Sequence, residues 1–180
     1  MAFATETDLR YPIGKFQRPD NVTDDQRRAA IQTIEEAPSK FRAAVAGLDD
    51  QQLDTPYRPS GWTVRQTVHH VADSHMNAYM RFKLALTEDV PTIKPYLEAR
   101  WAELPDSKLP VASSLEILEG LHQRWVVLLR SIAPADWARE FRHPEHGKTL
   151  TLETNAALYA WHSRHHLAHI TALRERNSWR

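Results

Sequence analysis

Four long stretches of this sequence repeat apolar residues with the period of an α-helix, and connections rich in proline or glycine separate them. The predicted helices span residues 23–48, 63–87, 113–132 and 151–176. The first three open on a hydroxyl residue followed three positions later by Gln or Glu, a spacing that caps a helix N-terminus. Those pairs are Thr23 with Gln26, Thr63 with Gln66, and Ser113 with Glu116. Four amphipathic helices with one long crossover predict an all-α fold, a four-helix bundle.

Prolines mark the places where helices are not expected to continue. Residues 88–111 hold four prolines and are predicted to form an extended crossover instead of a helix. Residues 133–150 form a second long connection, and weak alternation over residues 148–152 predicts a short strand or hairpin. Pro38 lies inside the first predicted helix and is expected to kink or break it. Residues 1–20 are expected to be an extended leader on the surface of the bundle.

Length and composition exclude several classes of protein. A chain of 180 residues fits one domain over residues 1–180. The charges balance, with 23 Lys+Arg against 23 Asp+Glu, whereas a nucleic-acid-binding protein is expected to be basic. No apolar run approaches the roughly 20 residues needed to cross a bilayer, and the first residues lack the apolar segment of a secretory signal. We therefore expect a cytoplasmic protein, with neither a nucleic acid nor a membrane as its partner.

The absence of cysteine narrows the possible chemistry further. A chain without cysteine has no disulfide, no thiolate metal site and no cysteine nucleophile. Histidine, by contrast, is frequent, with 10 in the chain. Any metal site in this protein must therefore be built from histidines and carboxylates.

The last predicted helix carries a cluster of histidines. With His162 set at 0° on a helical wheel, His166 lies at about 40°, His169 at about −20° and His165 at about −60°. Large apolar side chains occupy the same arc, so His162, His166 and His169 are predicted to point into the core. Buried imidazoles need partners, and one divalent metal ion can serve several of them. A set of hydrogen-bonded core histidines is the alternative.

A third ligand must come from another helix, since a mononuclear site needs at least three. The predicted helix at residues 63–87 offers His69, His70 and His75. On its wheel His75 lies on the main apolar arc, His70 lies on a flank between two apolar arcs, and His69 lies off the main arc. This pattern does not choose between His70 and His75. Asp73 lies three residues after His70 and could orient a ligand, although an ordinary surface carboxylate fits equally well.

Three other residues are weaker candidates. His122 is expected to be a surface or packing histidine. His143 lies in a connection rich in proline and glycine, where a solvated side chain is expected, although a loop near the mouth of the metal site could contribute to it. Trp161 is adjacent to His162 and is a candidate for a wall of the site.

Two segments that contain most of the histidines form long motifs: QLDTPYRPSGWTVRQTVHHVADSHMN at residues 52–77 and YAWHSRHHLAHITALRE at residues 159–175. Both segments resemble the YfiT branch of the DinB-like superfamily. The similarity continues through RFKLALTED at residues 81–89, LHQRW at residues 121–125 and the leader segment YPIGKF. The resemblance therefore covers nearly the whole chain.

This resemblance implies a fold and a metal site. The expected fold is a four-helix bundle, homodimeric in YfiT-like members, with one zinc or nickel ion held by three histidines. By position in the matching motifs, the implied ligands are His70, His162 and His166. His169 and Asp73 are then candidates to orient those ligands from behind.

Three imidazoles leave open positions on a zinc or nickel ion, as in catalytic sites. Such an ion can generate hydroxide from water for hydrolysis, or bind a low-molecular-weight thiol as a thiolate. The branch resembles both metal-dependent hydrolases and bacillithiol transferases. We therefore expect a thiol S-transferase that uses a thiol such as bacillithiol, with two alternatives: a hydrolase of a small substrate, and a non-catalytic metal-binding stress protein. The residues alone do not separate transfer from hydrolysis.

Overall fold

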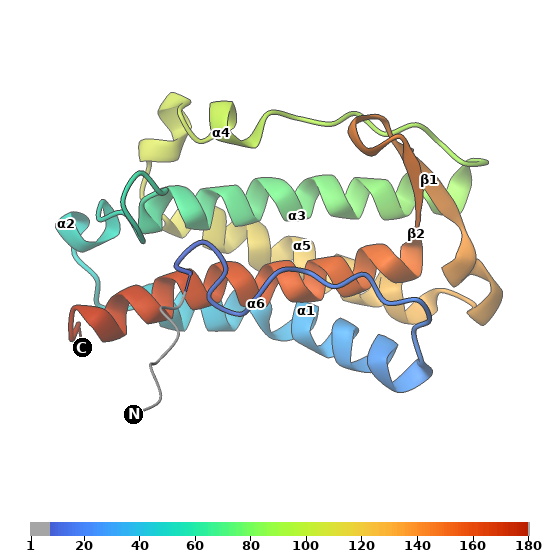
Figure 1. Ribbon diagram of the computed structural model, residues 1–180, viewed down its shortest axis with the longest axis horizontal. Coiled ribbons are helices and arrows are strands. Elements are labelled where there is room, and N and C mark those ends of the chain that lie inside the picture. Colours follow the sequence, from blue (N-terminus) through green and yellow to red (C-terminus); the bar gives the residue numbers. More distant parts are fainter. Residues whose placement is uncertain (1–7, 180) are drawn as a thin grey trace.

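The computed structural model describes residues 8–179, so the first part of the predicted leader, residues 1–7, lies outside the described residues. Four long helices form a bundle (Figure 1). They are α1 (Asp24–Val45), α3 (Val64–Thr87), α5 (Ala112–Ser131) and α6 (Leu152–Arg176). None of the helices within this described range is long and apolar enough to span a membrane.

Short elements occupy the connections between these helices. They are α2 (Asp50–Leu53), α4 (Glu98–Trp101), the 3-10 turns η1 (Pro105–Lys108), η2 (Pro134–Ala138) and η3 (Pro144–His146), and the strands β1 (Glu140–His143) and β2 (Lys148–Thr151). The two strands pair antiparallel, with Phe141 opposite Leu150, which confirms the predicted hairpin. The crossover at residues 88–111 is not wholly extended as predicted, because α4 and η1 form between its prolines.

Local caps define most helix starts as predicted. Thr23 and Thr63 each form a complete capping box with the Gln three residues later. The predicted box at Ser113 is wrong, because α5 begins one residue earlier, at Ala112, without a side-chain cap. The hydroxyl of Ser113 donates instead to the carbonyl of Pro110, at 3.0 Å. Helix α1 continues through Pro38, so the predicted break does not occur, and the helix ends at Val45.

The interior of the bundle contains two apolar clusters rather than one. Both α1 and α3 pack against α5 and α6. One cluster surrounds Phe82 and Trp125, and the other surrounds Phe41, Leu118 and Ile170. Along α5 and α6, His122, His162 and His166 lie between the stretches that supply these two clusters. On α3, His75 does so too, whereas His70 lies within the stretch that supplies the second cluster. We call these five the histidine layer: His70, His75, His122, His162 and His166.

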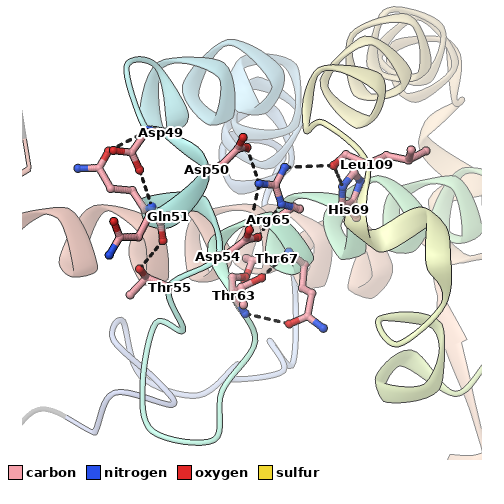
Figure 2. A network of polar contacts seen from close by, with 12 residues as sticks. Asp49, Asp50, Gln51, Asp54, Thr55, Thr63, Arg65, Thr67, His69 and Leu109 are labelled. Atoms are coloured by element: carbon pink, nitrogen blue, oxygen red, sulfur yellow. Dashed lines mark hydrogen bonds and ion pairs between the residues drawn. The ribbon is translucent and has the colours of Figure 1, made fainter.

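A buried arginine attaches the loops to the N-terminal end of α3 (Figure 2). The side chain of Arg65 donates from Nε to Asp54 at 2.7 Å, from Nη2 to Asp50 at 2.8 Å, and from Nη1 to the carbonyl of Leu109 at 3.3 Å. Arg65 is only 6% exposed, so these contacts supply the partners that water cannot. They connect α2 and the end of the crossover to the helix that carries His70.

Candidate metal centre

Three histidines from two helices converge inside the bundle. His70 on α3 and both His162 and His166 on α6 each offer one ring nitrogen, and these nitrogens all lie within 4.8 Å of one another. His70 Nε2 and His162 Nε2 are 3.3 Å apart. The ring centroids of His162 and His166 are 4.4 Å apart because these residues are four positions apart on one helix. This geometry can hold one divalent ion.

The structure also separates the roles of His70 and His75, which the helical wheel did not. His75 Nε2 lies 3.2 Å from His162 Nδ1, and His75 Nδ1 lies 2.8 Å from His122 Nε2. His75 therefore contacts His162 from behind, at the ring nitrogen turned away from His70. His122, only 2% exposed, is a buried packing histidine and not a surface residue.

His69 faces away from the three converging histidines. Its Nδ1 lies 2.7 Å from Ser114 Oγ, and its Nε2 lies 3.0 Å from the carbonyl of Leu109, which Arg65 also contacts (Figure 2). Both ring nitrogens are therefore occupied at the start of α5 and the end of the crossover.

A second group of histidines lies along α6, on the side covered by the leader. His165, His166 and His169 also offer nitrogens within 4.8 Å of one another. His165 stacks on Trp161 at 4.4 Å, and His169 stacks on Tyr57 at 3.9 Å. Trp161 thus packs beside His165 and is absent from the lining of the cavity that the three converging histidines share.

The two residues predicted to orient the ligands, His169 and Asp73, form no hydrogen bond to them among the residues that the structure describes. His169 Nε2 lies 3.3 Å from the carbonyl of Arg10 in the leader. Burial raises the pKa of Asp73 to about 6. Within residues 8–179, no hydrogen bond joins the Asp73 carboxyl to His70, His162 or His166. The contact with His162 from behind comes from His75, one of the two residues of α3 that the helical wheel left open as a ligand.

A cavity of about 400 Å³ opens onto His70, His162 and His166. The ring of Trp62 lies over His70, with centroids 4.4 Å apart. His143, expected to be solvated, is 7% exposed and lines this cavity, because the hairpin folds it inward.

Polar side chains continue from the histidines along the cavity. Ser74 Oγ lies 3.4 Å from His162 Nε2 and 3.3 Å from the hydroxyl of Tyr159. Arg81 donates from Nη1 to that hydroxyl at 3.5 Å. Across the described part of the chain, no carboxylate pairs with Arg81, although Glu98 lines the same cavity. The cavity therefore presents a cationic group beside the histidines.

Burial keeps the histidines neutral. It lowers the pKa of His70 to about 4, and it holds the pKa of His162 and of His166 well below the ordinary value. Metal ligation requires the neutral imidazole, whose free nitrogen carries the lone pair. These side chains therefore suit a metal ion at neutral pH.

The family follows from comparison with known sequences. The DinB superfamily matches residues 33–170. The chain belongs to the DinB superfamily. A relative from Bacillus mycoides (strain KBAB4), named "putative metal-dependent hydrolase", is 60% identical over 172 residues, covering 96% of this chain and 99% of the relative. A relative of the same name from Bacillus cereus (strain ATCC 10987 / NRS 248) is 59% identical over the same length.

A solved structure supports the same placement in the superfamily. YfiT from Bacillus subtilis matches with a TM-score of 0.93 and 50% identity, covering 96% of this chain and 99% of that one. It is described as "a probable metal-dependent hydrolase with an unusual four-helix bundle topology". The predicted four-helix bundle and the resemblance to the YfiT branch are both confirmed.

We expect the metal-free protein to lose thermal stability as the pH falls from about 6.5 to about 4. Unfolded histidines take up protons near pH 6.5, whereas the folded pKa of His70 and of His122 is about 4. The unfolded state therefore binds more protons in this window, and unfolding is favoured. Asp73 has the opposite effect, because its raised pKa of about 6 makes the folded state bind a proton before the unfolded state does. It is one group against several histidines, so the loss of stability is expected to prevail.

Melting temperatures recorded by circular dichroism with a chelator present measure this effect. A melting temperature that stays constant across the window would show that the histidines are not buried as neutral groups.

Proposed function

We propose that His70, His162 and His166 bind one divalent ion, zinc or nickel, in each chain. The observation that carries this proposal is the convergence of three neutral imidazoles on one cavity. The metal dependence in the names of the relatives supports it. The group on the leader side of α6 is less suitable, because His165 and His169 stack on aromatic rings and do not line that cavity.

The reaction proposed for this site is transfer of a low-molecular-weight thiol, such as bacillithiol, to a small electrophile. Zinc or nickel would supply Lewis acidity, which at neutral pH activates a thiol or a water molecule. A thiol from solution would provide the sulfur that this chain, which has no cysteine, lacks. Arg81 carries a positive charge toward the cavity and can hold an anionic group of the substrate, while Trp62 limits access of water to His70.

Hydrolysis of a small substrate is the second candidate. The names of the relatives favour it. Glu98 favours it too, because this residue brings a carboxylate to the cavity, and a carboxylate can act as general base toward water. A non-catalytic metal-binding stress protein, the third candidate, would show neither activity.

Each of the variants His70→Ala, His162→Ala and His166→Ala is expected to lose tight metal binding, since the two remaining imidazoles form a weak site. His69→Ala is the matched control: it removes a buried histidine of α3 that is turned toward Leu109 and Ser114. Elemental analysis of the purified proteins should give about one ion per chain for the control and the wild type. Full occupancy in any of the three ligand variants would refute the proposed ligand set.

The choice between the reactions depends on an assay with and without thiol. The metal-loaded protein is mixed with a thiol-reactive electrophile in the presence of bacillithiol, mycothiol or glutathione, and in parallel with an ester in the absence of thiol. A transferase forms the conjugate faster than the uncatalysed reaction of thiol with electrophile only when the metal is bound, and His166→Ala gives only the uncatalysed rate. Ester hydrolysis without conjugate formation would favour the hydrolase, and inactivity in both assays would favour the binding protein.

The homodimer that the family resemblance implies is also part of the proposal. We expect light scattering at micromolar concentration to give twice the chain mass. A single species of 20.8 kDa would reject the dimer.

A further inference from the structure

The proline inside α1 leaves one backbone carbonyl free in the core. In a regular helix the N–H of residue 38 would donate to the carbonyl of Ile34. Pro38 has no N–H, so that hydrogen bond is missing although the helix is continuous. His122 Nδ1 on α5 lies 2.5 Å from this same carbonyl oxygen. The His122 side chain thus donates the hydrogen bond that the missing N–H of residue 38 would have donated.

This contact determines where the proton of His122 lies. A carbonyl oxygen can only accept, so Nδ1 of His122 must carry the proton. Burial lowers the pKa of His122 to about 4, and the ring is therefore neutral with a single proton. Its Nε2 is left with a lone pair and accepts.

The same reasoning continues through two more rings. His122 Nε2 accepts from Nδ1 of His75 at 2.8 Å, which leaves His75 Nε2 as an acceptor. That nitrogen lies 3.2 Å from Nδ1 of His162, which must then be the donor. The proton of His162 is thereby held on Nδ1, and Nε2, 3.3 Å from His70 Nε2, keeps its lone pair.

We propose that Pro38, His122 and His75 form a positioning chain that holds His162 in the one tautomer able to ligate the metal through Nε2. This inference rests on the proposed metal site, and it adds three residues that do not touch the metal. A ligand histidine is commonly oriented through its other ring nitrogen, and loss of that partner costs about 10- to 100-fold in metal affinity. Here the chain of hydrogen bonds that orients His162 on α6 starts at the backbone carbonyl of Ile34 on α1.

His122→Phe is the first test, with His69→Phe as its matched control. Both variants replace a buried histidine that makes two hydrogen bonds, and both should lower the melting temperature of the metal-free protein. Only His122→Phe should weaken binding of zinc, by about 10- to 100-fold in competition with a chelator. Equal zinc affinity in the two variants would overturn the proposal.

Pro38→Ala provides a test that should not damage the fold. Alanine restores an N–H that competes with His122 for the carbonyl of Ile34, and alanine is also the better residue inside a helix. The melting temperature of the metal-free variant should therefore stay the same or rise, while zinc binds several-fold more weakly. Unchanged zinc affinity with a raised melting temperature would contradict a role for the proline in this chain.

Nitrogen-15 NMR of the imidazoles tests the tautomers without any metal. At neutral pH the metal-free wild type should show His75, His122 and His162 protonated at Nδ1, and His162 should lose this single state in His122→Phe. A proton on Nε2 of His162 in the wild type would overturn the inference even if the metal site is correct. If the wild type binds no zinc, the proposed function fails, and the tautomers still decide whether the chain of hydrogen bonds exists.

Discussion

The bundle depends on satisfying a layer of imidazoles inside a helical core. A buried polar nitrogen without a partner costs about 1–3 kcal/mol, so a layer of five histidines is tolerable only when the rings serve one another. The carbonyl of Ile34 begins this arrangement, because it can accept a hydrogen bond and cannot donate one. On the other side of the layer, the nitrogens of His70, His162 and His166 face one another. A metal ion there would give each of these three rings a partner.

The elements around the histidine layer hold its helices in place and close its cavity. Apolar clusters on both sides fix the rotation of α3 and α6, and thus the spacing of the three nitrogens. The loops then close the cavity: Trp62 lies over His70, and the hairpin brings in His143. Arg65 holds the loop ends beside α3 (Figure 2), and the described part of the leader runs across α6 (Figure 1).

The similarity to the YfiT branch extends over nearly the whole chain, yet the three histidines alone do not select a reaction. Three imidazoles on one metal suit hydrolysis and thiol transfer equally, because both need only an open position and a nucleophile. The selectivity must come from the cavity around them. Arg81 and Glu98 bring opposite charges to that cavity, and they are the residues through which the two reactions can be told apart.

The sequence by itself determined what depends on neighbours along the chain. Four helices, the capping boxes at Thr23 and Thr63, and the pairing of His162 with His166 are all local, because they involve residues three or four positions apart. The start of α5 escaped this reasoning because the hydroxyl of Ser113 donates to the carbonyl of Pro110, two residues before the helix begins. The short helices α2 and α4 escaped it because elements of a single turn have no period to detect.

The helical pattern left His70 and His75 open and the resemblance implied His70, but only the tertiary structure shows how the two side chains are placed. His75 lies on the main apolar arc of α3 and His70 on a flank between two arcs, and the rotation of that helix against α5 and α6 sends His70 toward the cavity and His75 toward His122. The same holds for the carbonyl of Ile34. The loss of its helical hydrogen bond is a local effect, since Pro38 causes it, but its partner, His122, comes from α5. Sequence spacing cannot fix such contacts, because they are set by how the packed side chains of separate helices interlock.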